Sequence, residues 1–158
     1  MRIVNWLPYA CLMLTGCIPS RAADVSVVLE HGNCQQIERG ARRVEFAEVA
    51  RLRGAELLAM NTPTDAKVAD LVLVAVSLGS RPTLGYRLHA VGDPRVEDRV
   101  LTISVGEEAP AKDAIVAQMV TEPCIVFGVS SDDLRSIHIE DAAGNTIGDV
   151  EVPKPATP

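Results

Sequence analysis

Aromatic side chains are scarce in this sequence, which contains one Trp, two Tyr and two Phe among 158 residues. Because aromatic rings line most pockets that hold small ligands, their scarcity argues against a ligand carrier. Basic residues are also outnumbered, with 15 Lys and Arg against 21 Asp and Glu, and the net charge is −6. Nucleic-acid binding needs a basic surface. We therefore expect no nucleic-acid partner.

The sequence also lacks the usual motifs of catalytic and metal sites. Neither C-x-x-C nor H-x-x-x-H occurs, and the three His residues stand singly, so we expect no metal and no other cofactor. No Ser has the G-x-S-x-G context of a nucleophile. Glu107 and Glu108 are adjacent and would point to opposite faces of a strand. These absences predict a protein that is not an enzyme; an uncharacterised hydrolase is the enzymatic alternative.

Residues 1–17 have the layout of an export signal, with one Arg, an apolar stretch and then small residues. The segment Leu14-Thr15-Gly16-Cys17 resembles the lipobox of bacterial lipoproteins, in which the Cys sulfur receives a diacylglyceryl group and the chain is cut just before it. The resemblance implies a signal peptide at 1–16, lipidation of Cys17 and a tether at 17–24. The alternative is an ordinary cleaved signal, after which Cys17 would join a disulfide.

A lipidated Cys17 would place the protein in the cell envelope, held to a membrane by acyl chains such as palmitate. Ile18, rather than Asp, follows the Cys. This resembles sorting to the outer membrane in Gram-negative bacteria.

Two other Cys residues, Cys34 and Cys124, remain once Cys11 has left with the signal and Cys17 is acylated. A pair of Cys in an exported domain most often forms a disulfide. This one would close a loop of about 90 residues, worth roughly 4–5 kcal/mol in the chain-entropy model. We predict that the bond ties the amino-terminal segment to the main sheet.

Residues 25–152 are predicted to form a single globular domain, followed by a disordered tail at 153–158 that holds three prolines. The centre of this domain is predicted to be the strand Leu71–Leu78, which is apolar on both faces. Helical spacing of apolar residues predicts a helix over Phe46–Arg53. Further strands are expected at Val25–Leu29, Tyr86–Val91, Val100–Val105, Ala114–Thr121 and Cys124–Val129, with a turn at Gly92–Pro94 and a hairpin pairing Leu134–Glu140 with Ile147–Val152.

This pattern predicts an α+β fold dominated by β-structure. Its sheet would be antiparallel or mixed, arranged as a sandwich or a partly open barrel, with one amino-terminal helix packed against it.

The loop after the central strand contains Gly79, Pro82 and Gly85, which indicate unusual backbone dihedrals or a close approach. The segments Leu78–Leu88, Val100–Pro110 and Val116–Val129 together resemble the carboxy-terminal domain of the protease complex subunit PrcB family over about residues 68–130. The matching positions are Gly79, Arg81, Pro82, Gly85 and Tyr86, followed by Gln118, Thr121 and Pro123.

The family is known from a surface complex in which a lipoprotein subunit accompanies a protease. The resemblance implies a non-catalytic, protein-binding accessory module in the cell envelope, with an exported protease or another envelope protein as its partner. A loop fixed by Gly and Pro is a common recognition element, so Ser80, Arg81, Pro82, Thr83, Gly85 and Tyr86 form the candidate recognition loop. A purely structural envelope lipoprotein, or a small-ligand carrier, is the alternative.

Overall fold

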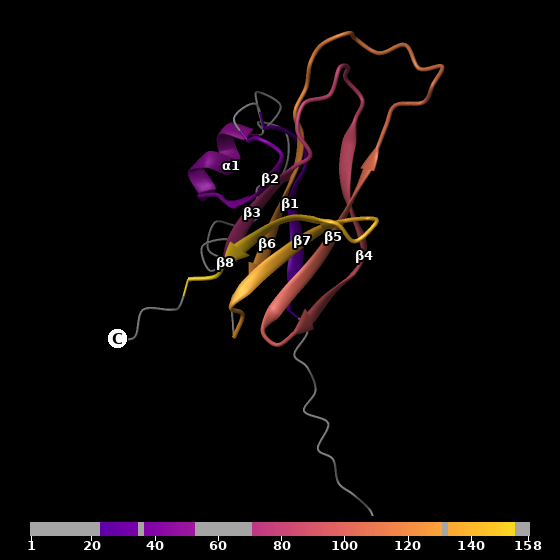
Figure 1. Cartoon of the computed structure of the whole chain (residues 1–158). Helices are drawn as coiled ribbons and strands as arrows, with labels where there is room; N and C mark the ends of the chain where they lie inside the picture. Colours follow the sequence, from indigo (N-terminus) through magenta and orange to yellow (C-terminus); the bar gives the residue numbers. More distant parts are fainter. Residues whose placement is uncertain (1–22, 35–36, 53–70, 131–132, 154–158) are drawn as a thin grey trace, which may run out of the picture.

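The computed structural model describes residues 23–34, 37–52, 71–130 and 133–153. Its strands form two four-stranded sheets, ordered β1-β6-β3-β2 and β4-β5-β7-β8 (Figure 1). The elements are β1 (Val25–Asn33), β2 (Gly40–Arg43), α1 (Phe46–Leu52), β3 (Leu71–Ser77), β4 (Arg87–Glu97), β5 (Val100–Glu108), β6 (Pro123–Ser130), β7 (Ser136–Asp141) and β8 (Thr146–Glu151).

Both sheets contribute to one apolar core, which makes the fold a sandwich. Val74 and Phe127 of the first sheet belong to the same buried cluster as Leu101, Ile137 and Val150 of the second. The fold is therefore β-dominated, as predicted. All strand pairs are antiparallel except β5 with β7, which run parallel, so the second sheet is mixed.

Strand β3 is buried on both faces, as its continuous apolar sequence predicts. Val74 and Val76 face the second sheet within the main core. Leu73 and Ala75 point to the opposite face, into a smaller cluster that includes Val49 of α1. Alternate residues of one strand thus supply two separate apolar clusters. The short helix α1 spans seven residues, and among those whose burial is described, Val49 is buried.

A disulfide joins Cys34 to Cys124, with the two Cα atoms 5.8 Å apart. Both Cys residues are buried within the smaller apolar cluster. The backbone N–H of Cys34 also donates to the carbonyl of Glu122 at 2.8 Å. The bond therefore fastens the end of β1 to the start of β6.

The predicted turn at Gly92–Pro94 is wrong, because β4 continues through these residues. The register jumps from Val91 opposite Ser104 to Arg95 opposite Thr102, so Gly92, Asp93 and Pro94 form a bulge in the edge strand. The chain reverses instead at Asp98 and Arg99, with φ of 48° and 66°. Two consecutive positive φ values are typical of a type I′ hairpin turn.

The predicted carboxy-terminal hairpin is confirmed as β7 and β8. Its turn is organised by Asp141, whose Oδ1 accepts hydrogen bonds from the backbone N–H groups of Ala143 and Asn145 and from the Asn145 side chain. These bonds lower the pKa of Asp141, and the Asn145 side chain is the largest cause.

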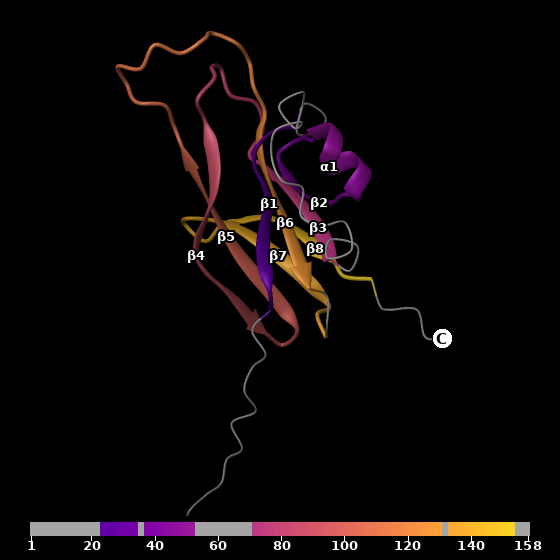
Figure 2. The same cartoon turned by 180° about the vertical axis from the view of Figure 1, so that it is seen from behind.

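The first described residues lie at one end of the sandwich. Asp24 accepts a hydrogen bond from Ser130, at the end of β6. Two loops, 79–86 and 109–122, project from the other end, where β6 begins (Figures 1 and 2). No helix in the described part of the chain is long and apolar enough to cross a membrane. Cys17 and most of the tail at 153–158 lie outside the described residues.

Candidate functional site: an arm braced at one end of the sandwich

Residues 79–86, between β3 and β4, and residues 109–122, between β5 and β6, lie side by side and are here called the arm (Figure 1). At its base, Arg81 and Thr121 exchange two backbone hydrogen bonds, of 2.7 and 2.9 Å. Higher up, the N–H of Leu84 donates to the carbonyl of Ala117 at 3.1 Å. The Thr121 hydroxyl donates to the carbonyl of Thr83 at 3.0 Å. These bonds join the two loops into one projecting element.

The Arg81 side chain is the main clamp of the arm. Its guanidinium makes a two-pronged ion pair with Glu107, and one of these contacts, from Nη2 to Oε2, measures 2.8 Å. Nη1 donates to the carbonyls of Leu78 and Ser80, and the group lies 5.8 Å from the centre of the Tyr86 ring. The hydrogen bond with Glu107 raises the pKa of Arg81 against the opposing effect of burial.

Two glycines allow the arm's tight path, as the sequence predicts. Gly79 and Gly85 have φ of +86° and +98°, which L side chains rarely adopt. A Cβ on Gly85 would also lie 3.1 Å from Cβ of Pro110 in the opposing loop. Gly85 therefore provides both the conformation and the close approach of the two loops.

The residues of the candidate recognition loop divide into two groups. Arg81, Thr83 and Tyr86 are partly buried, and all three take part in the internal contacts of the arm. Ser80, Pro82 and Gly85 are exposed, and the Ser80 hydroxyl donates to Glu122 at 3.1 Å. Of the other family positions, Thr121 and Pro123 are buried, Gly79 is partly buried and Gln118 is exposed.

The strand predicted at Ala114–Thr121 is wrong. Only Thr121 is bridged, to Arg81, and residues 114–120 join no sheet. The carbonyl of Ala117 accepts from Leu84 and also from Met119, two residues further along the chain. This tight turn at Gln118 interrupts the alternation that a strand requires.

Sequence reasoning missed the outer surface of the arm. Seven large apolar side chains are exposed in the described part of the chain, and four of them lie here. We call these four the exposed apolar residues of the arm: Leu84 at 39%, Met119 at 54%, Val120 at 65% and Ile115 at 104% relative exposure. The signal in the sequence is the uncharged run Ala114–Thr121, which follows Lys112-Asp113 and for which the sequence predicts a strand.

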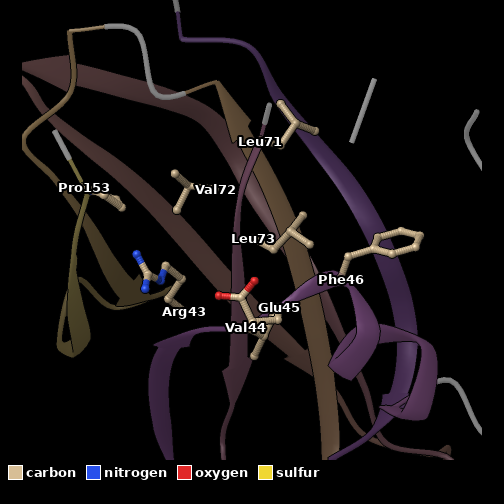
Figure 3. Close-up of a pocket in the computed structure, with 8 residues that line it drawn as sticks. All are labelled: Arg43, Val44, Glu45, Phe46, Leu71, Val72, Leu73 and Pro153. Atoms are coloured by element: carbon tan, nitrogen blue, oxygen red, sulfur yellow. The ribbon is translucent and has the colours of Figure 1, made fainter. Parts of the chain in front are cut away.

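A groove lies at the other end of β3 from the arm, where residues of β2, α1 and β3 meet Pro153 (Figure 3). This groove has a volume of about 380 Å³ and is lined by Arg43, Val44, Glu45, Phe46, Leu71, Val72, Leu73 and Pro153. A neighbouring groove shares Arg43 and Pro153 and adds Arg135, Glu151 and Val152. Two Arg and two Glu give the pair no net charge, so no ligand class is indicated.

Polar side chains also gather on the outer face of the second sheet. His138 Nδ1 lies 2.7 Å from Asp149 Oδ1. Glu140 accepts from Ser104 at 2.7 Å and from Arg95 at 3.1 Å. In the regions described, no three His, Cys, Asp or Glu side chains are placed to hold a metal ion.

Comparison with known proteins supports the resemblance seen in the sequence. No match was found among curated proteins or among solved structures. A family model described as PrcB C-terminal matches residues 72–130. This range runs from the start of β3 to the end of β6 and contains the whole arm. The segment that builds the arm is thus similar to the C-terminal domain of the PrcB family.

Proposed function

We propose that this protein is an exported, lipid-anchored accessory subunit that binds a protease complex of the cell envelope through its arm. It acts by contact and catalyses no reaction. One observation carries this proposal. In the segment similar to PrcB, hydrogen bonds join the two loops of the arm, while four large apolar side chains of the same arm stay exposed. Four of the seven large apolar side chains exposed in the described part of the chain lie on this one element, and such a concentration is typical of an interaction site.

The placement of the arm supports this role. Chain entry at Asp24 and the arm lie at opposite ends of β6, whose eight residues span about 26 Å. A lipid at Cys17 would attach the entry end to a membrane, leaving the arm directed away from it. The arm would then meet partners in the aqueous phase rather than the anchoring lipid.

Anchoring is tested by mass spectrometry of the protein recovered from membranes. We expect a chain that begins at Cys17 and carries acyl chains, and Cys17→Ser should lose both. An unmodified Cys17 in the recovered protein would contradict the anchor.

Partner binding is tested by capturing the tagged full chain from detergent-solubilised membranes. We expect an exported protease, or a protein that copurifies with one, to be recovered with the wild type. The double variant Leu84→Asp and Met119→Asp should lose this partner. Val27→Asp is the matched control, because Val27 is 47% exposed on β1, away from the arm. Equal recovery by the arm variant and the control would contradict the proposal.

A further inference from the structure

Met119 is the one methionine in the described part of the chain, and it lies in the arm at 54% relative exposure. Its neighbours along the chain, Gln118 and Val120, are exposed as well. A thioether side chain exposed to this degree is open to small reagents dissolved in water, because the oxidation of a sulfur follows its exposure.

The other sulfur atoms that the structure describes are already oxidised. Cys34 and Cys124 form a disulfide, and both residues are buried, at 0% and 1% relative exposure. A disulfide offers no thiolate, which is the form of Cys that two-electron oxidants attack. Within the described residues, Met119 therefore carries the sulfur that such an oxidant can reach.

The bonds that hold the arm leave the Met119 side chain out. Its backbone N–H donates to the carbonyl of Ala117 at 3.0 Å, and the same carbonyl accepts from Leu84 at 3.1 Å. At the base of the arm, Arg81 and Thr121 are joined through their backbones. A chemical change confined to the thioether should therefore leave the arm folded.

The chain around Met119 is uncharged. Residues 114–121 include no Lys, Arg, Asp or Glu, although Lys112 and Asp113 precede this run and Glu122 follows it. Oxidation converts the flexible apolar side chain of methionine into a polar sulfoxide. One added oxygen atom would thus make part of the exposed apolar surface polar, with no change in net charge.

We propose that Met119 is a site of reversible oxidation, and that its sulfoxide weakens partner binding by the arm. Hydrogen peroxide transfers one oxygen atom to the sulfur, which loses two electrons as the O–O bond breaks and the second oxygen leaves as water. In the reverse step, a methionine sulfoxide reductase removes the oxygen as water while two thiols become a disulfide. This inference rests on the proposed function and adds control by oxidants to it.

The modification is tested by treating the purified full chain with hydrogen peroxide and mapping its peptides by mass spectrometry. We expect one oxygen on Met119, added within about threefold of the rate for free methionine, because the side chain is exposed. The two methionine sulfoxide reductases, one for each epimer, should together remove it. Oxidation slower than this by two orders of magnitude, or a sulfoxide that neither reductase repairs, would overturn the proposed site.

The change in surface polarity is measured on a phenyl column, which serves as an apolar surface of known chemistry. The oxidised chain should elute earlier than the untreated chain, and repair should restore its retention. Met119→Leu, which lacks the sulfur and has a similar volume, should keep its retention after peroxide treatment. Met60→Leu is the matched control and should respond like the wild type. Unchanged retention of the oxidised wild type would contradict the proposal.

Oxidation should change the surface of the arm and leave its fold intact. The unfolding temperature should be the same before and after treatment, and so should amide hydrogen exchange at Leu84 and Thr121, whose N–H groups bond across the arm. Faster exchange at these two positions would show that oxidation opens the arm, and the proposed change of surface would then be wrong.

Partner capture separates this inference from the proposed function. Oxidation of the wild type should weaken binding of the captured partner at least about tenfold, because a sulfoxide buried without a hydrogen bond is costly. Met119→Gln, which is polar without oxidant, should be similarly weak, and Met119→Leu should bind equally well with and without peroxide. Equal binding by the oxidised and untreated wild type would overturn this inference and leave the accessory role standing. If the retention shifts but the untreated chain captures no protease or protease-associated protein, the oxidation site stands and the proposed function falls.

Discussion

The sandwich and the arm place their apolar and charged side chains in opposite positions. In the sandwich, Ile125 and Phe127 are fully buried between the sheets. In the arm, Arg81 makes a partly buried ion pair with Glu107 at the end of β5, while Ile115 is fully exposed to solvent. The sandwich is therefore stabilised by removing apolar area from water, and the arm by hydrogen bonds and one ion pair. Apolar residues that folding leaves exposed in the arm stay available for binding.

The disulfide inside the sandwich, which has no counterpart in the arm, is expected to give the largest effect. Replacing both Cys34 and Cys124 with Ala should lower the free energy of unfolding by about 4 kcal/mol, because their loop spans 90 residues. Urea denaturation of the wild type, with and without a reductant, should reproduce this difference. The double variant should show no further change with reductant. A loss below about 1 kcal/mol would mean that the bond between β1 and β6 contributes little to the stability of the sandwich.

Two identical substitutions compare the regions directly. Ile125→Ala should cost about 2–5 kcal/mol of unfolding free energy, because Ile125 is 0% exposed and its removal leaves a cavity. Ile115→Ala should change stability by less than about 0.5 kcal/mol. Thermal and urea unfolding measure both. Similar costs at the two sites would show that the arm does not keep its apolar residues outside the folded core.

The ion pair tests whether the arm is held by polar contacts. Arg81→Ala removes the bonds to Glu107, Leu78 and Ser80, and should cost about 1–2 kcal/mol after allowance for partial exposure. Amide hydrogen exchange should accelerate at Leu84 and Thr121, whose N–H groups bond across the arm. Arg87→Ala, at the exposed start of β4, is the control and should leave this exchange unchanged. Unchanged exchange in Arg81→Ala would contradict the clamp.

The smallest effect concerns a turn that belongs to neither the core nor the arm. Because folding lowers the pKa of Asp141 below 3.8, its ionised form stabilises the protein at neutral pH. That stability is fully present above about pH 4 and is lost as the pH falls through the lowered pKa. The stability difference between wild type and Asp141→Asn should therefore shrink in acid. Urea unfolding at pH 7 and pH 3 measures it, and a constant difference would contradict this account.

Most of the sandwich could be predicted from local sequence. The apolar run of β3 and the turn residues between β7 and β8 predict these elements directly. The β4–β5 turn was misplaced, because Gly92-Asp93-Pro94 carries stronger turn residues than Asp98-Arg99. Pairing across the whole hairpin, rather than local preference, decides where this chain reverses.

The arm was only half predictable. Gly79 and Gly85 indicate an unusual loop, and the structure gives both a positive φ. The pairing of Arg81 with Glu107 joins residues 26 positions apart, which no local pattern contains. The run from Ala114 to Val120 has the composition of a strand, but the turn at Gln118 and the bonds to the opposite loop keep it out of the sheets. Which apolar residues face solvent is decided by this tertiary arrangement.

The irregular edges of the two sheets bear on how the molecule behaves when crowded. Edge strand β4 carries the bulge at Gly92–Pro94, and Pro94 offers no N–H to a neighbour. Edge strand β1, on the same side, shifts register twice against β6. Neither edge presents a long, regular row of donors and acceptors to which another copy could add a strand. Many copies can thus lie close together without seeding fibrils through these edges.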